Sequence, residues 1–509
     1  MGATPYFSGV DYLLALPISL LTLFAIGILL IDLLLPPQWK RLNAATALVG
    51  VGFAAEGVWK IQAWYQAQHI DRYPVGFMNT LLVDRMALYF FYLFLAGTAV
   101  AILMSVRYLE IEHENHGEFY ALMLFSVVGM MCMASGYDIV LIFIGLELMA
   151  ISTYVLVGFL RRDQRSNEAA LKYLLLGAFS SGIFAYGLSL LYGITGSTNL
   201  QAIYERLSEQ VARLGPSNPI LVVAMLTTAT GLLFKIAAVP FHQWAPDAYE
   251  GAPTSITGFM SVSVKAAGWA MLLRIFIALF ALRPVYVPFL VFVSVATMTG
   301  ANFAALTQTN LKRLLAYSSI AHVGYMLLGL IAGTSDSLNP DGLKGILVYL
   351  LVYTFMNLGA FAVITSLRQR DVIGDEIDDI AGLYSRAPTE AVLMLIFLLS
   401  LAGIPPLAGF WGKYFIFLSL IESGHYALAS LAVLYSVFGL YYYLRIANAM
   451  FMRQPLEKEH LRSSPAMGVA LFITAAATLF IGILPNTLIQ IVNGVLGLTQ
   501  VTPVANLVR

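Results

Sequence analysis

A succession of apolar segments, each about as long as one membrane crossing, constrains the fold of this chain more than any other feature. A helix of about 20 apolar residues spans the hydrocarbon layer of a bilayer. About fourteen such segments occur, beginning near Tyr12, Ala44, Leu88, Phe119, Ile139, Ala169, Pro219, Thr254, Val287, Leu314, Leu343, Ala391, Tyr426 and Ala466. Only short loops remain between them. We therefore predict an all-α, polytopic membrane protein of about fourteen transmembrane helices.

Composition supports this fold class and excludes others. Hydrophobic residues make up 59% of the chain and charged residues 11%, which is more apolar than a soluble core requires. The first helix, at about residues 12–35, follows no basic region and precedes no small-residue cleavage site, so we expect it to be retained. A net charge of zero, from 28 basic and 28 acidic residues, leaves no footprint for nucleic acid. We expect the lipid bilayer, and no nucleic acid, as a partner.

Few residues could hold a metal or a redox group. The single cysteine, Cys132, lies in an apolar segment and can form neither an intramolecular disulfide nor a thiolate cluster site. His113 and His116 have a ligand-like spacing, but they lie in a polar loop without further ligands. We therefore expect no metal and no bound cofactor in this chain, and we expect any electron carriers in other chains.

The loops differ in charge when they are assigned alternately to the two sides of the membrane. One side then carries fourteen basic residues and the other carries seven. Loops rich in Lys and Arg stay on the cytoplasmic side. The count predicts a multi-pass protein with both termini outside the cytoplasm.

Four ionisable side chains lie where hydrocarbon is expected. Lys235, Lys265 and Lys413 fall inside long apolar stretches, and Glu147 is the ninth residue of the segment that begins at Ile139. A charge at the bilayer centre costs roughly 2.5 to 3.5 kcal/mol by insertion scales, so it usually marks an ion pathway or a proton relay. These four residues predict a chain that moves protons.

Other readings of these residues stay open. Glu147 could belong to a structural buried pair, and lysines near an interface can extend to water along their flexible stems. Lys172 lies near the start of its helix, where the same reading applies. His242 and His322 lie at membrane depth and could be hydrogen-bonded core residues, although imidazole also suits a relay near neutral pH. We favour proton transfer for the two histidines.

Two segments are too irregular to be single straight spans. The first, GLLFKIAAVPFHQWAPDAYEGAPTSITGF, contains three prolines, and the second, residues 391–421, contains LAGIPPLAGFWGKYFIF. Proline removes a backbone donor and interrupts a helix. Paired interruptions in the two halves of a chain point to an inverted-repeat transporter with an ion site near the midplane. A lysine lies beside each break, at Lys235 and at Lys413.

Longer strings resemble a known family. LELMAISTYVLVGF, SNEAALKYLLLGAFSSGIFAYGLSLLYG, FKIAAVPFHQWAPDAYEGAP and NLKRLLAYSSIAHVGYMLLG, together with the LAGIPP segment, are similar to the antiporter-like subunits of respiratory complex I. The resemblance covers nearly the whole chain beyond about residue 80. YYYLRIANAMF and IDDIAGLYSRAP look most like the subunit N branch of bacterial NADH:quinone oxidoreductase. Lys413 stands where the sister subunit M carries a glutamate, and subunit L would continue into a long lateral helix.

The resemblance implies roles for individual residues. Glu147 and Lys235 would form the ion pair of a first half-channel, and Lys172 would modulate that pair. Lys265 would be the middle relay, assisted by His322, and Lys413 would be the terminal donor of a second half-channel. His242 would be auxiliary.

The resemblance also implies an architecture of two inverted five-helix repeats with broken helices 7 and 12. Three leading helices would occupy residues 1–117, the first repeat (helices 4–8) residues 118–283 and the second repeat (helices 9–13) residues 284–455. A trailing helix and tail would occupy residues 456–509.

The partners implied are the neighbouring antiporter-like subunit M, the small membrane subunits K, J, A and H, and a peripheral redox arm. NADH, FMN, iron–sulfur clusters and quinone, such as ubiquinone, would be held by those subunits. The expected location is the bacterial cytoplasmic (inner) membrane. Quinone reduction elsewhere would then drive proton transfer here.

Two further classes remain. A cation/proton antiporter subunit of the multisubunit Mrp type shares the same helices and lysines, and neighbouring genes would distinguish it. A polytopic membrane enzyme such as a lipid-linked glycosyltransferase should show carboxylate clusters in long loops. RDVIGDEIDDIAG is the nearest string to such a cluster, and it reads better as a solvated acidic loop.

Overall fold

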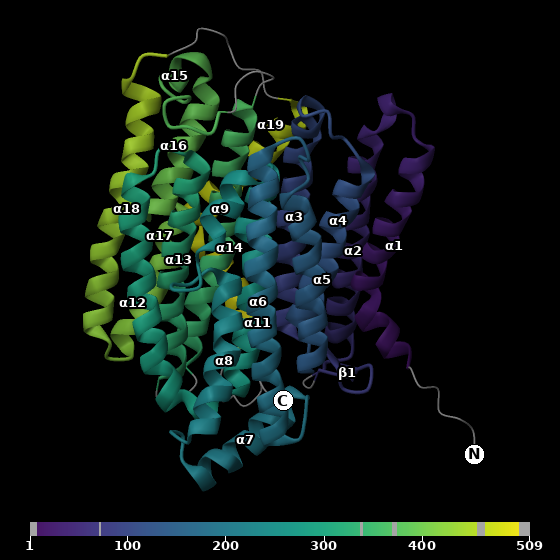
Figure 1. Cartoon of the computed structure of the whole chain (residues 1–509), viewed down its shortest axis with the longest axis vertical. Helices are drawn as coiled ribbons and strands as arrows, with labels where there is room; N and C mark the ends of the chain where they lie inside the picture. The colour runs from purple at the N-terminus through teal and green to yellow at the C-terminus, as the bar shows by residue number, and fades with distance from the viewer. Residues whose placement is uncertain (1–7, 71–72, 336–338, 369–373, 456–463, 498–509) are drawn as a thin grey trace.

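Long helices standing side by side make up nearly the whole molecule (Figure 1). The computed structural model describes residues 8–70, 73–335, 339–368, 374–455 and 464–497. Thirteen helical segments in this part of the chain are long and apolar enough to cross a membrane. They are α1 (Gly9–Leu34), α2 (Arg41–Ala67), α3 (Arg85–Ile111), α4 (Gly117–Ser135), α5 (Ile139–Val157), α6 (Gln164–Thr195), α8 (Pro219–Ile236), the run α10 (Thr254–Phe259), η2 (Met260–Val264) and α11 (Lys265–Ala278), then α12 (Arg283–Thr307), α13 (Leu311–Thr334), α14 (Pro340–Leu367), α18 (Tyr426–Met452) and α19 (Pro465–Ile483).

The fourteenth crossing is made by two shorter helices. α16 (Pro388–Ala402) and α17 (Ala408–Glu422) have 15 residues each. At 1.5 Å per residue, each is about 22 Å long, which is less than the roughly 30 Å of a bilayer core. Together they form one interrupted crossing. The predicted all-α fold with about fourteen spans is therefore confirmed, and so is the break in the twelfth.

Several short elements complete the described chain. They are the helices α7 (Leu200–Leu214), α9 (Trp244–Gly251), α15 (Leu383–Arg386) and α20 (Pro485–Val495), the 3₁₀ turns η1 (Pro37–Trp39) and η3 (Phe280–Leu282), and the antiparallel hairpin of β1 (Val75–Gly76) and β2 (Leu81–Leu82). α7 buries only Leu200, Ile203 and Leu207, which is the one-sided pattern of an amphipathic helix. Neither α7 nor α20 was predictable from hydropathy, because both are shorter than a membrane span.

The two ends of the bundle differ in their contacts. At one end, the start of α2 and the ends of α3 and α14 are joined by ion pairs, Arg41 with Glu110 and Arg368 with Glu112 at 2.6 Å. We call this the charged end. At the opposite end, where β1 and α7 lie in Figure 1, Phe77 N donates to Asp11 Oδ1 at 2.6 Å. We call this the hairpin end.

Both ends of the described chain lie at the hairpin end. Asp11 belongs to the first turn of α1, and Arg85 Nη1 donates to the carbonyl of Gly494 in α20 at 3.0 Å. An even number of crossings requires this arrangement. The end that faces the cytoplasm is indicated only by the distribution of basic residues between the loops.

Burial differs strongly among the spans and marks the centre of the bundle. The most apolar 18-residue stretch of the α10–α11 span is completely buried, and that of α13 is 94% buried, against 28% for α1 and 33% for α18. Lys265 and His322 lie on the two central spans. Their surroundings are therefore protein and not lipid.

Candidate functional site

The seventh span is interrupted just beyond Lys235. α8 ends at Ile236, and Ala237 follows with a left-handed backbone, φ +61°. The chain becomes helical again at Trp244, whose indole Nε1 donates to the Phe234 carbonyl at 2.9 Å. The same carbonyl also accepts from Ala237 N at 2.9 Å, so two donors hold this end of the helix. The break therefore fixes the last turn of α8, where Lys235 lies.

Lys235 is held by an aromatic hydroxyl. Its side chain is only 4% exposed, and its Nζ donates to the Tyr173 hydroxyl at 3.4 Å. The Tyr173 ring in turn stacks on Trp244, with ring centroids 4.5 Å apart. Lys235 is thus positioned by α6 and by α9, the helix beyond the break.

Glu147 lies near Lys235 without touching it. Glu147 Oε1 is buried and has no hydrogen-bond partner in the described structure, and no salt bridge within 4 Å joins the two described residues. A void of about 10 Å³ adjoins Lys235 and is lined by Leu146 and Ala150 of the Glu147 helix. Such a void is about the size of one water molecule. The predicted ion pair is therefore not a direct contact, and its role in transport stays a prediction.

Lys265 lies directly after a π-helical turn. η2 inserts one residue into the α10–α11 span, and Lys265 is the next residue. Single π turns inside α-helices are frequent at functional sites. The Lys265 Nζ donates to the Ser319 carbonyl at 3.2 Å and to the Ser319 hydroxyl, and it lies 5.9 Å from the centre of the Tyr249 ring.

His322 lies one turn beyond Ser319 on α13 and is bracketed by two tyrosines. Its Nδ1 hydrogen-bonds with the Tyr349 hydroxyl of α14, and its Nε2 lies 3.1 Å from the Tyr443 hydroxyl of α18. Tyr443 also hydrogen-bonds with the Ser318 hydroxyl. A neutral imidazole donates at one nitrogen and accepts at the other, while a hydroxyl can do either. This arrangement can pass a proton through His322.

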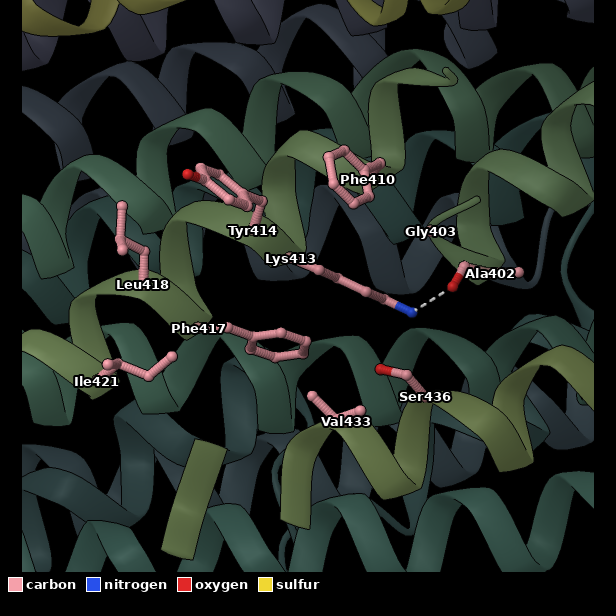
Figure 2. A pocket seen from close by; sticks show the side chains of 10 residues that line it. All are labelled: Ala402, Gly403, Phe410, Lys413, Tyr414, Phe417, Leu418, Ile421, Val433 and Ser436. Carbon is pink, nitrogen blue, oxygen red and sulfur yellow. Dashed lines mark hydrogen bonds between the residues drawn. The ribbon is translucent and has the colours of Figure 1, made fainter. Parts of the chain in front are cut away.

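Lys413 lies on α17 and reaches back across the second break (Figure 2). Its Nζ donates to the carbonyl of Ala402, the last residue of α16, at 2.8 Å. A helix C-terminus carries partial negative charge and favours a cation. The side chain is 6% exposed and lies 5.2 Å from the Tyr325 ring centre. A pocket of about 250 Å³, lined by Lys413 and Ser436, opens beside it.

Gly403 makes room for Lys413. Its φ of +87° lies in the left-handed region that favours glycine. A Cβ at this position would lie 2.9 Å from Lys413 Cδ. The break and the lysine are therefore fitted to each other.

The two auxiliary residues lie apart from this line. His242 is half-buried in the connection between α8 and α9, and its Nδ1 has no hydrogen-bond partner among the described residues. Lys172 pairs with Glu168 at 2.7 Å and with Asp247 of α9 at 3.0 Å, and its side chain is 45% exposed. Lys172 therefore pairs directly with Glu168 and Asp247 and not with Glu147.

Several residues that contribute to the site were not among the predicted ones. Asp247 also binds Arg313 at 2.7 Å, which attaches α9 to α13. Tyr173, Tyr349 and Tyr443 were missed because tyrosine is common in apolar helices. The only available signal was the placement of Asp247 within the proline-interrupted string. Among the described residues, no group of three or more His, Cys, Asp or Glu is placed to hold a metal ion.

A polar pocket of about 400 Å³ lies at the charged end, above the start of α10. Lys312 Nζ donates to the Ala252 carbonyl at 3.0 Å and lies 3.4 Å from Asp375 Oδ2. Burial raises the pKa of the Asp375 carboxyl. The pocket places titratable groups at the end of the helix that carries Lys265.

Known proteins resemble this chain over most of its length. Residues 136–439 match the family described as NADH:quinone oxidoreductase/Mrp antiporter, TM. The chain is 66% identical over 504 residues to NADH-quinone oxidoreductase subunit N 1 of Koribacter versatilis (strain Ellin345), with 98% of each chain covered. A chain of respiratory complex I from Thermus thermophilus with bound aureothin matches with a TM-score of 0.76 at 32% identity, covering 93% of this chain and 98% of that chain.

A chain of the Mrp complex from Dietzia sp. DQ12-45-1b matches with a TM-score of 0.78 at 21% identity, over 94% of this chain and 96% of that one. At that identity the likeness is one of fold alone.

Proposed function

This chain belongs to the family of antiporter-like membrane subunits, in its subunit N branch, and we propose that its buried lysines carry protons through it. It is a proton-translocating membrane subunit of NADH:quinone oxidoreductase, complex I. The chain shares high sequence identity with subunit N relatives, whereas its likeness to the Mrp complex is one of fold alone. This difference favours complex I over the Mrp-type alternative. Family membership also removes the glycosyltransferase alternative.

One observation supports proton transfer by the three lysines. Lys235, Lys265 and Lys413 are all buried, and their Nζ atoms donate hydrogen bonds to neutral oxygens of Tyr173, Ser319 and Ala402. No salt bridge within 4 Å reaches any of the three in the described part of the chain. Burial without a counter-charge disfavours the charged form of a lysine. Each lysine can therefore release its proton when its surroundings change slightly.

The line of transfer follows the contacts. We assign Glu147 and Lys235 to the first half-channel, where Glu147 Oε1 lies buried without a hydrogen-bond partner among the described residues. Lys265 passes the proton on through Ser319 and its neighbour Ser318 on α13. His322 then relays it between Tyr349 and Tyr443. Lys413 is the terminal donor. His242 and Lys172 are auxiliary, with Lys172 acting through Asp247.

The charged end supplies a route for proton uptake. Asp375 and Lys312 face the polar pocket, and the Lys312 ammonium holds the carbonyl that precedes α10. We assign this end to the cytoplasm, because the loops there carry the excess of basic residues. Both termini then lie on the periplasmic side.

The remaining assignments are proposals for the assembly. The helices form two inverted repeats, residues 118–283 and 284–455, after three leading helices and before a trailing one. Subunits M, K, J, A and H of the membrane arm are the proposed neighbours, in the bacterial inner membrane. Redox chemistry with NADH, FMN, iron–sulfur clusters and quinone stays in the other subunits.

Substitution of Lys413 tests the proposal. In proteoliposomes containing the whole complex, Lys413→Ala should reduce proton pumping and quinone-coupled turnover, because a coupled machine stalls when one channel is blocked. Lys413→Arg should fail too, since guanidinium keeps its proton at working pH. The matched controls are Lys60→Ala and Lys60→Arg, because Lys60 lies on the surface of α2 in an ion pair with Glu56.

Pumping at the wild-type rate by Lys413→Arg would show that Lys413 is an electrostatic anchor of the α16 end. The reconstituted complex makes this distinction measurable, because assembly and turnover are recorded on the same preparation.

A further inference from the structure

A further pocket, remote from the lysines, lies at the hairpin end between α2, α3, α14 and α20. Its volume is about 1040 Å³, which is at the upper end of the roughly 300–1,000 Å³ of ligand pockets. We call it the aromatic slot, because Tyr65, Tyr89 and Tyr92 contribute to its walls. None of its lining residues belongs to the proton path.

The slot changes in polarity along the membrane normal. Near the hairpin end it is lined by Gln66, His69 and Arg85, whereas its deeper part is lined by Leu93, Ala96 and Phe355. Arg85 and Ala96 are eleven residues apart on α3, which corresponds to about 16 Å of helix at 1.5 Å per residue. Half of a bilayer core of roughly 30 Å has the same depth. The slot therefore matches one leaflet in both length and polarity.

The hydroxyls of Tyr65, Tyr89 and Tyr92 are already hydrogen-bonded. That of Tyr92 donates to Gln62 Oε1 at 3.2 Å. Tyr89 donates to the Leu347 carbonyl at 2.6 Å, and Tyr65 donates to the Val83 carbonyl. Both rings are buried. Because their polar atoms are already paired, these residues offer ring faces to an occupant, as tyrosines near a membrane interface commonly do.

The polar mouth carries positive charge without an acidic neighbour in its lining. Arg85 is exposed and uses one nitrogen, Nη1, for the Gly494 carbonyl. A guanidinium has five N–H donors, so others remain. His69 is also exposed, and the lining contains no Asp or Glu among the described residues. Arginine suits a phosphate group because its planar fork can donate two parallel hydrogen bonds.

We propose that the aromatic slot binds one anionic phospholipid of the leaflet at the hairpin end. The phosphate lies at Arg85, between α3 and the end of α20, and an acyl chain runs along α3 to Ala96 against Phe355. The lipid thereby joins the trailing helix α20 to the leading helices. Phosphatidylglycerol is the simplest lipid of this chemistry.

Native mass spectrometry of the intact complex tests the headgroup. With limiting phosphatidylglycerol, Arg85→Gln should retain about 10-fold less lipid than the wild type, as expected for the loss of one hydrogen bond to a charged group. The matched control is Arg206→Gln, because Arg206 also lies at the hairpin end and donates to a helix-end carbonyl, that of Thr195 at 2.8 Å. Equal retention in the two variants would overturn the proposal.

A photo-cross-linking residue tests the occupant itself. Tyr92 lines the slot and is 37% exposed, so replacing it with p-benzoylphenylalanine keeps an aromatic side chain there. Irradiation should add the mass of one phospholipid to this chain, and Ala96→Phe in the same protein should suppress that adduct by filling the apolar end. An adduct with another polypeptide, or one that survives Ala96→Phe, would show that a partner subunit or bulk lipid occupies the site. NADH:quinone turnover of each variant reports whether the complex is intact.

Discussion

Three lysines share one arrangement at the scale of single residues. The Lys235 ammonium meets a tyrosine hydroxyl, that of Lys265 a serine, and that of Lys413 a helix-end carbonyl. Each contact positions the amine without fixing its charge. A direct carboxylate partner would instead hold the proton firmly. The pattern favours transfer over storage of a proton.

The relay through His322 makes a prediction about Tyr443. Tyr443→Phe removes the hydroxyl between His322 and Ser318 while keeping the ring. We expect proton-coupled quinone turnover to fall about 100-fold, the lower end of the loss when a positioned proton-transfer group is removed. Tyr435→Phe is the control, since the Tyr435 hydroxyl on the same helix hydrogen-bonds with Thr299. If the two variants have equal turnover and equal pumping, the relay does not pass through Tyr443.

Glu147 and Lys235 should act on one path although they do not touch. We expect Glu147→Gln and Lys235→Met each to impair turnover severely, and the double variant to be no worse than the more impaired single one. Groups that serve a single step are strongly non-additive. Proton uptake in inverted vesicles and NADH:quinone turnover measure the effect.

The α2 surface pair Glu56 and Lys60, at 2.9 Å, is the control for Glu147 and Lys235. Its substitution by Gln and Met should leave turnover unchanged. Losses that multiply in the Glu147 and Lys235 double variant would show that the two residues belong to separate steps.

Ionisable residues were predictable at this scale, while their partners were not. Lys235, Lys265 and Lys413 stand out because charge is rare in apolar segments. Ser319 and Tyr443 do not stand out, because hydroxyls are tolerated throughout membrane helices. Tyr443 reaches His322 across 121 residues of sequence. Only the packing of α18 against α13 reveals that contact.

At the scale of elements, each of the two interrupted spans places its own lysine at the C-terminus of a helix. Lys235 lies in the last turn of α8, and Lys413 binds the last carbonyl of α16. Prolines made both breaks predictable, since each removes a helix donor. The π turn before Lys265 was not predictable, because MSVSV carries no proline or glycine.

The second break makes a prediction about glycine. Gly403→Ala should lower pumping, because the new Cβ would lie 2.9 Å from Lys413 Cδ and displace that side chain. Gly424→Ala is the matched control, since Gly424 also has a left-handed backbone, φ +78°, but nothing within 4 Å of a Cβ. Both variants should lose roughly 1 kcal/mol of stability for the backbone strain.

Proton pumping and thermal melting of the assembled complex separate the two effects in the glycine variants. Loss of pumping in Gly403→Ala alone is the expected result. Equal pumping in the two variants would mean that the position of Lys413 tolerates the extra atom.

At the scale of the whole molecule, the ends of the bundle follow from the count of spans. The fourteen crossings of the described chain bring the start of α1 and α20 to the hairpin end, where Asp11 and Arg85 hold the hairpin and α20. The number of spans was predictable because hydropathy reports length directly. The central place of α10–α11 was not, because its mean hydropathy lies between those of the less buried spans α2 and α18, and only packing separates them.

The ratio of protons pumped to electrons transferred tests the central claim most directly. Lys265 lies at the centre of the bundle, on a completely buried span. In proteoliposomes with the whole complex, Lys265→Met should lower that ratio or stall turnover, while Lys60→Met should match the wild type. A wild-type ratio together with wild-type turnover in Lys265→Met would contradict a proton path along the buried lysines.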